Sequence, residues 1–322
     1  MPPPEIALKG RLPEVEIERI WKLFREGERI WARRPDLQAA FPAVHPMDFW
    51  FWLMWHGSRE EPEVARLMYP EPPTHLMYRV VGQEATPRGF LEGGLVDWRR
   101  MHLCLTEGGF EFERGGRVLD FGCGCGRILR FFARYASTCK FSGADVDEGA
   151  VDWCRQIFDF ATFERLLHRP PSPFPSGHFD AVYAFSVFSH LPETLHRAWL
   201  EELFRITRPG AVVVLTIQGR RVIDKMIARG SPSDIPSSAE LRRDLPRILK
   251  DGLAFYPFRK LTLQNERNQQ HFDEWDLEQY GSTFILPHYV HDRWTDLFDV
   301  VSLHLAPDDW QDYVVLRRLP RG

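Results

Sequence analysis

From residue 117 onward, short apolar runs alternate along the chain with segments whose apolar residues recur every three or four positions. The runs RVLDFG, KFSGADV, FDAVYAFSVF (179–188) and AVVVLTI (211–217) have the length and composition typical of buried strands. The intervening RILRFFARYA, EGAVDWCRQIFDF and the stretch that stops at Arg208, Pro209 and Gly210 have helical periodicity. A further strand near 164–168 is signalled only weakly. This alternation predicts an α/β fold, with a parallel sheet covered by helices on both faces.

The chain after residue 217 departs from this alternation. About 80 residues precede the last two apolar runs, which is too many for a simple crossover. They include helical pieces at 220–229 and 238–250 and an extended stretch at 280–286. We expect residues 219–297 to form a cap over the carboxyl edge of the sheet. The final runs, FDVVSLHL and DYVVLRRL, predict an antiparallel hairpin that closes the sheet.

Residues 1–115 have a different pattern and predict a helical region that precedes an α/β domain at 116–322. Apolar residues recur at helical spacing from Val15 to Trp31. The segment FPAVHPMDFWFWLMWHG (41–57) is so aromatic that a helix there would be apolar on nearly every side. We expect it to be buried, or docked against a protein partner or a second copy of the chain. An aromatic sugar-binding platform is the alternative. PEPP (70–73) predicts a rigid connection.

Composition narrows the function classes. The chain has 322 residues, and its formal net charge of −4 supplies no general attraction to nucleic acid or anionic lipid. No apolar run approaches the roughly 20 residues that a membrane span needs. The start, MPPPEIALKG, lacks a signal-peptide pattern, and five scattered cysteines suit reduced thiols. We therefore expect a cytoplasmic protein with no nucleic-acid partner and no membrane span.

The densest cluster of candidate chemistry is LDFGCGCGR (119–127), which follows the first strand. Zinc needs about four ligands, whereas Cys123 and Cys125 supply two and no second pair has metal-site spacing, so we expect no metal. A glycine turn between strand and helix suits a nucleotide, but the spacing is G-x-G-x-G and not the dinucleotide G-x-G-x-x-G. S-adenosylmethionine carries no phosphate, and its amino-acid end can lie against such a turn. Asp145, at the end of the second strand, can accept its ribose hydroxyls.

With these motifs, residues 117–219 resemble class I S-adenosylmethionine-dependent methyltransferases. VLDFGCGCGR is similar to their first motif, and RITRPGAVVVLTIQG to the turn before their fifth strand. The resemblance implies a Rossmann-like sheet of seven strands, mostly parallel, with an antiparallel last strand. It also implies contacts to the methionine half from Asp120, Gly122, Cys123, Gly124 and Gly126. By the same resemblance Asp145 holds the ribose and Val146 packs near the adenine, while Ala184, Phe185 and Ser186 face the sulfonium. His168 stands where the family often has an acid for the adenine amino group, which puts that contact in doubt.

Methyl transfer to an alcohol requires alignment and the removal of a proton. His190, just past the fourth strand, is the first candidate for the base, and a structural role in packing a loop is its alternative. The cap histidines His271, His288 and His291 are further candidates. The Asp/Asn-Pro-Pro-Tyr/Phe motif of nucleic-acid amino methylation is absent where Ala184 to Val187 stand, and no Pro-Cys nucleophile is present. Methylation of nucleic-acid bases is therefore not expected.

Two segments carry a further resemblance. RRPDLQAAFPAVHPMDFWFWLMWHG is similar to helical segments of bacterial glycan-assembly proteins. QYGSTFILPHYVHDRWTDLF, followed by QDYVVLRR, is similar to the tails of methyltransferases encoded with glycosyltransferases. This implies a saccharide acceptor, a sugar hydroxyl of a bacterial polysaccharide or its precursor. A small-molecule O- or N-methyltransferase of secondary metabolism and a non-catalytic, cofactor-binding scaffold are the alternatives.

Overall fold

The computed structural model describes residues 69–81, 86–230, 236–258, 278–305 and 310–320. The helices expected before residue 68, the partner contact expected at 41–57 and His271 lie outside this part of the chain. Within it, the N-terminal region contains helix α6 (Thr74–Val81) and helix α7 (Pro87–Glu107). Residues 70–73 precede α6 without regular structure, as a connection would. No helix of the described residues combines the length and apolar content needed to cross a membrane.

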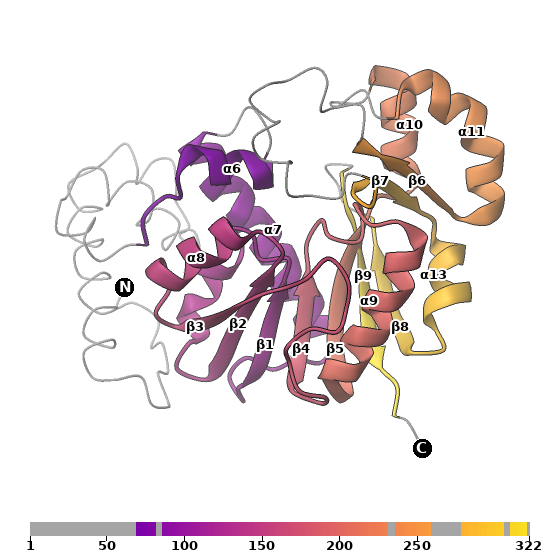
Figure 1. The fold of residues 1–322 in the computed structure, drawn as a ribbon. Coiled ribbons are helices and arrows are strands. Elements are labelled where there is room, and N and C mark those ends of the chain that lie inside the picture. The colour runs from indigo at the N-terminus through magenta and orange to yellow at the C-terminus, as the bar shows by residue number, and fades with distance from the viewer. Residues whose placement is uncertain (1–68, 82–85, 231–235, 259–277, 306–309, 321–322) are drawn as a thin grey trace, which may run out of the picture. The chain divides into compact units, whose positions relative to one another are not determined.

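The central sheet has seven strands in the order β3-β2-β1-β4-β5-β9-β8 (Figure 1). Strands β1 (Gly116–Phe121), β4 (Phe179–Ala184) and β5 (Thr207–Ile217) pair in parallel, as do β2 (Cys139–Asp145) and β3 (Ala161–Arg165). Strand β9 (Asp312–Arg318) is antiparallel to both β5 and β8 (Phe298–His304). The expectation of a mostly parallel, Rossmann-like sheet with an antiparallel last strand is confirmed.

Two strand boundaries differ from the sequence prediction. β3 lies at Ala161–Arg165 and not near 164–168, because as an edge strand it buries Phe163 alone among exposed neighbours and leaves little apolar signal. β4 ends at Ala184 although the apolar run continues to Phe188. The reason is local, since Ser186 has a φ of 59° and cannot continue an extended strand.

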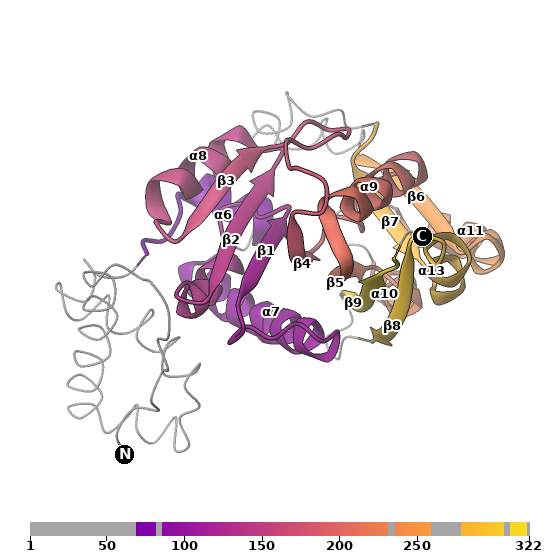
Figure 2. The same cartoon turned by 90° about the horizontal axis from the view of Figure 1, so that it is seen from below.

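The chain divides into two compact units. The first comprises residues 1–100, 111–116 and 123–165, and in its described part helix α8 (Glu148–Ile157) lies along β2 and β3 (Figure 2). The predicted helix at RILRFFARYA is a 3-10 helix at Leu129–Tyr135. It begins late because Gly126 has a φ of 75°, outside the right-handed helical region. Aromatic rings fill this unit's core, where Phe112 stacks on Phe132 and Tyr135.

The second unit comprises residues 101–110, 117–122 and 166–322. Helix α9 (Glu193–Ile206) packs through Trp199 on Phe121 of β1, with ring centroids 5.0 Å apart. The helix ends at Ile206, before the stop predicted at Arg208, Pro209 and Gly210, and β5 follows at once, so the strand includes these three residues and starts earlier than the apolar run at 211. Helix α13 (Pro287–Trp294) lies beside β8 (Figure 2) and buries Trp294 near Phe188.

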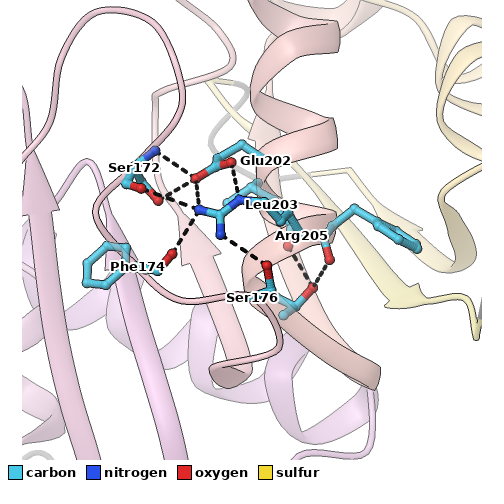
Figure 3. A network of polar contacts seen from close by, with 8 residues as sticks. Ser172, Phe174, Ser176, Glu202, Leu203 and Arg205 are labelled. Carbon is cyan, nitrogen blue, oxygen red and sulfur yellow. Dashed lines mark hydrogen bonds and ion pairs between the residues drawn. The ribbon is translucent and has the colours of Figure 1, made fainter.

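Hydrogen bonds to an ion pair within helix α9 hold the loop before β4. Glu202, 4% exposed, pairs with Arg205, and its carboxylate accepts the Ser172 backbone N–H at 2.7 Å (Figure 3). Arg205 also donates to the carbonyl of Phe174 at 2.8 Å. Burial alone would raise the pKa of Glu202, but the hydrogen bonds from Arg205 and Ser172 outweigh it and lower that pKa. The loop is thereby held where β4 begins.

The segment between β5 and β8 contains the two helices expected from the sequence, α10 (Arg220–Arg229) and α11 (Ser238–Asp251). It also contains an antiparallel pair, β6 (Leu253–Pro257) and β7 (Gly281–Ile285), of which only β7 was expected. Figure 1 shows this pair beside α10 and α11. The four elements share an apolar cluster of Val222, Ile223, Met226, Leu241, Ile248, Ala254, Phe284 and Leu286. The role of 219–297 as a cap, and the division of the chain at residue 115, stay predictions.

Candidate functional site

The glycine turn after β1 adopts a backbone that only glycine supports easily. Gly122 and Gly124 have φ angles of 80° and 49°. A Cβ added to Gly122 would collide with Val187, and one added to Gly124 would lie 2.6 Å from Val80 Cγ1. Val187 follows β4 and Val80 belongs to α6, so each glycine permits a close approach between the turn and a neighbouring segment. The turn is therefore shaped by packing as well as by its own geometry.

Most backbone amides of this turn are already engaged inside the protein. The Cys123 N–H donates to the Ala144 carbonyl at 3.1 Å, and the Gly126 N–H to the Cys123 carbonyl at 2.9 Å. The Gly124 N–H donates to Asp145 Oδ2 at 2.7 Å. The turn can bring its backbone close to a ligand, but these three amides are not free to bind the ligand's carboxylate.

Asp145 organises the turn and keeps capacity for a ligand. Its Oδ2 accepts the Gly124 amide, and its Oδ1 accepts the Asp147 amide at 2.9 Å. An ionised carboxylate offers about four acceptor positions, and the Val146 amide also acts on this one, so capacity remains for a hydroxyl group beside the amides. Burial raises the pKa of Asp145, the Asp147 and Gly124 amides oppose this, and the Asp147 charge adds to it. The carboxylate fits the ribose diol of S-adenosylmethionine.

Helix α6 is tied to the same turn by side chains that the sequence prediction did not single out. Arg79 forms an ion pair with Asp147, whose side chain is only 8% exposed. Asp147 also caps α8, because its Oδ1 accepts the Ala150 amide. The Cys125 thiol donates to the Leu76 carbonyl at 3.7 Å. Through these contacts α6 supports Asp147 and, by way of the Asp147 amide, the carboxylate of Asp145.

The cysteines of the turn have a packing role. All five cysteines are buried thiols outside any disulfide, and burial raises the pKa of Cys125 to about 12. The Cys154 thiol donates to the Gly124 carbonyl at 3.3 Å. Across the described ranges, no three His, Cys, Asp or Glu side chains gather into a group that could hold a metal ion.

In the second unit, the chain after β4 is held in a strained conformation. Ser186 is the one non-glycine residue of the described ranges with a positive φ, and its N–H donates to Thr216 Oγ1 at 2.7 Å. Strain of this kind persists where the surroundings enforce it and is common at functional sites. Its Oγ lies 3.2 Å from His190 Nε2 and 3.1 Å from Gln311 Nε2. Three segments far apart in the sequence therefore meet at Ser186.

His190 is fixed in one tautomer. Its Nδ1 lies 2.7 Å from the Gly281 carbonyl oxygen, which can only accept, so Nδ1 carries the proton and Nε2 keeps its lone pair. The ring also stacks on Tyr280, with centroids 5.0 Å apart. Burial lowers the pKa of His190 below the ordinary 6.5, and the bond to Gly281 acts in the opposite direction. The imidazole is therefore neutral near pH 7, and its unprotonated Nε2 faces the Ser186 hydroxyl.

The remaining predicted residues lie as follows. Asp120 and Ala184 are buried at the ends of β1 and β4, while Phe185 and Val146 are half-buried. His288 and His291 lie on the exposed side of α13, and His288 Nε2 is close to Gly252 at the end of α11. His168 is exposed beyond β3. The described contacts gather Ser186 and His190 but bring none of the other three histidines to them.

Sequence reasoning missed Gln311, Thr216 and Tyr280, which contact Ser186 and His190, and it missed Arg79, which pairs with Asp147. Gln311 is 125 positions from Ser186, and Arg79 is 68 from Asp147. No local pattern signals contacts over such distances. The one available signal was position, because Thr216 stands near the carboxyl end of β5, at the edge where open α/β sheets bind ligands.

Comparisons with known proteins bear on part of the chain. Residues 118–210 match the family model described as "Methyltransferase domain". A stretch of 103 residues is 32% identical to the fatty-acid O-methyltransferase of Mycolicibacterium smegmatis and covers 32% of this chain and 37% of that protein. A stretch of 117 residues is 30% identical to the cycloartenol-C-24-methyltransferase of Arabidopsis thaliana and covers 35% and 33%, respectively. The matches thus span about a third of these two relatives' length.

A solved S-adenosylmethionine-dependent methyltransferase from Mesorhizobium loti is 14% identical, with a TM-score of 0.45, and the match covers 71% of this chain and 100% of that one. The matched family region includes the glycine turn, Asp145, Ser186 and His190. Over residues 118–210 the chain is therefore similar to a methyltransferase domain.

Proposed function

We propose that the chain transfers a methyl group from S-adenosylmethionine to an acceptor hydroxyl, with His190 as the base. The observation that carries this is the hydrogen bond from His190 Nδ1 to the Gly281 carbonyl, which leaves Nε2 unprotonated. A base must offer a lone pair at the operating pH, and the lowered pKa of this half-buried imidazole meets that condition.

The bound cofactor supplies a methyl group on a positively charged sulfur, which leaves as a neutral thioether. Asp145 would hold the ribose with its remaining acceptor capacity, and the glycine turn would let the backbone approach the amino-acid end. The other cofactor contacts stay proposals from the resemblance. The methionine half would contact Asp120, Gly122, Cys123, Gly124 and Gly126, and the adenine would lie near Val146. Ala184 and Phe185 would face the sulfonium.

The path of the proton follows from the bonds around Ser186. Its hydroxyl, 3.2 Å from His190 Nε2, donates to that nitrogen and keeps its own lone pairs as acceptors. The acceptor hydroxyl donates to Ser186 Oγ. As the new O–C bond forms, its proton passes to Ser186 while the Ser186 proton passes to His190 Nε2. His190 ends as imidazolium, and its Nδ1–H remains on Gly281.

A sugar hydroxyl of a bacterial glycan or its precursor is the acceptor we propose first, on the resemblance of the chain's late segments. A small-molecule acceptor is the second candidate. The relatives favour it, since they include a fatty-acid O-methyltransferase and the 27-O-demethylrifamycin SV methyltransferase of Amycolatopsis mediterranei, which is 26% identical over 149 residues, 43% of this chain and 48% of that protein. A cytoplasmic location and a protein contact through residues 41–57 stay predictions.

The test is a transfer assay with S-adenosylmethionine labelled in the methyl group. The full chain is incubated with saccharides, lipid-linked glycans, fatty acids, phenols and amines, and both label transfer and S-adenosylhomocysteine release are followed. Label on an oxygen of the acceptor supports the proposal. Label on nitrogen alone would contradict it. Cofactor binding without release of S-adenosylhomocysteine in any mixture would favour the non-catalytic scaffold.

A further inference from the structure

The cluster around Ser186 contains a buried hydrogen-bond acceptor that the described residues leave unsatisfied. Gln311 is 8% exposed, and its Nε2 lies 3.1 Å from Ser186 Oγ and 3.4 Å from Ser189 Oγ. Its Oε1 is buried and has no partner among the described residues. Buried polar atoms are rarely left in that state, so an unsatisfied one beside reacting groups indicates a ligand.

The hydrogen bonds themselves determine which end of the Gln311 amide is unpaired. The Gly281 carbonyl fixes the proton of His190 on Nδ1, so Nε2 must accept. The Ser186 hydroxyl has one proton and gives it to Nε2, so its oxygen can only accept from Gln311. The NH2 group of Gln311 therefore faces Ser186, and its carbonyl oxygen is the free end.

A second carboxamide, Gln218, follows β5 directly. The pairing of β5 with β9 ends at Ile217 and Asp312, so Gln218 and Gln311 are the next residues of the two segments beyond that pair. The Oε1 of Gln218 is also buried without a partner in the described part of the chain. Two unsatisfied carbonyl oxygens thus lie at the edge of the sheet where Ser186 and His190 hold the reacting hydroxyl. Both oxygens accept hydrogen bonds, and neither can donate one.

We propose that Gln311 determines acceptor specificity by accepting a hydrogen bond from a second hydroxyl of the acceptor, next to the one that is methylated. This rests on the proposed function and names the class of acceptor, a polyhydroxylated molecule with neighbouring O–H groups. The rings of Tyr280 and Phe258 beside His190, with centroids 5.0 and 6.0 Å from the imidazole, supply apolar faces for the C–H side of such a molecule.

The inference can be tested by binding, without turnover. The full chain is saturated with S-adenosylhomocysteine and titrated with the methyl α-glycosides of glucose, mannose and rhamnose and with their monodeoxy derivatives. We expect the wild type to bind at least one glycoside and to lose about 3- to 10-fold in affinity when one particular hydroxyl is removed. Gln311→Met should bind the parent glycoside about as weakly as the wild type binds that deoxy derivative. Its affinity for the deoxy derivative should equal that of the wild type. S-adenosylhomocysteine affinity stays within about twofold.

Two further variants keep the result interpretable. Gln311→Glu preserves the shape and an acceptor oxygen, so the preference for the hydroxyl persists while turnover falls through the lost donation to Ser186. Gln156→Met, on the exposed side of α8, is the matched control, and it should change neither the affinity for the glycosides nor the affinity for S-adenosylhomocysteine. A hydroxyl preference that survives in Gln311→Met, or disappears in Gln311→Glu, would overturn the inference. So would a wild type that binds none of the glycosides.

The two proposals fail in different ways. If the wild type methylates octanoic acid or a phenol on oxygen but binds no glycoside, methyl transfer to oxygen stands and the role of Gln311 is refuted. If glycosides bind with the expected hydroxyl preference but no label is transferred to them or to any other acceptor, the role of Gln311 stands and the proposed reaction fails.

Discussion

Replacing His190 with asparagine separates its chemistry from its packing. The amide nitrogen of asparagine occupies the position of His190 Nδ1 and can keep the hydrogen bond to the Gly281 carbonyl. No lone pair then remains where Nε2 faced Ser186. We expect kcat to fall by about 10²- to 10⁴-fold, the usual contribution of a general base, which corresponds to about 2.7–5.5 kcal/mol of barrier. Affinity for S-adenosylhomocysteine should be unchanged.

His190→Ala provides the comparison. It loses the same base, so its kcat should match that of the asparagine variant. It also leaves the buried Gly281 carbonyl without a donor, which costs about 1–3 kcal/mol of folding stability. Urea unfolding of the two variants measures that difference. A base role thus predicts equal losses of kcat with unequal losses of stability.

The pH profile supplies an independent check. Burial lowers the pKa of His190, and the neutral form is the active one, so kcat should be flat at neutral pH and fall only below about 6.5. His190→Asn should show no such acid limb. If His190→Asn keeps wild-type kcat, or if its profile retains the limb, His190 is a packing residue and the proposed proton path is wrong.

Three further predictions concern the cofactor turn and the core. Asp145→Ala should weaken S-adenosylhomocysteine binding by about 10- to 100-fold in calorimetry, since a charged acceptor of the ribose is lost; unchanged affinity would refute that contact. Gly124→Val should abolish binding, because φ is 49° and Val80 occupies the space, and a normal titration would contradict the turn's geometry. Burial lowers the pKa of His196 to about 4, so this side chain takes up a proton at lower pH in the folded state than in the unfolded chain. The free energy of unfolding is therefore highest above about pH 6.5 and decreases by about 3 kcal/mol as the pH falls to 4. His196→Leu should remove that slope in urea titrations across this range, and a slope as steep as the wild type's would refute the assignment.

The sequence predicted those parts of the molecule whose causes are local. An apolar run of strand length marks β5, and three glycines at alternate positions mark a turn that needs positive φ angles. Asp145 could be named as a candidate ribose contact because it stands at the end of the next strand. The strained backbone of Ser186 left no trace in composition, because Thr216, 30 positions away, holds it. The strand β6 was missed because its pairing with β7 is what makes it a strand.

The proposed acceptor side depends on parts of the chain that the methyltransferase domain model does not cover. His190 is held by β7, since Gly281 accepts its Nδ1–H and donates to its carbonyl, and the Thr283 amide donates to Ser189. Gln311 comes from the start of β9. Of these segments only 186–190 lies within residues 118–210. The turn and Asp145 lie wholly inside that range, so similarity over it bears on the proposed cofactor contacts but carries little information on the acceptor. Relatives that share this region can therefore methylate different molecules, and the residue at the position of Gln311 should vary with the acceptor while Asp145 should not.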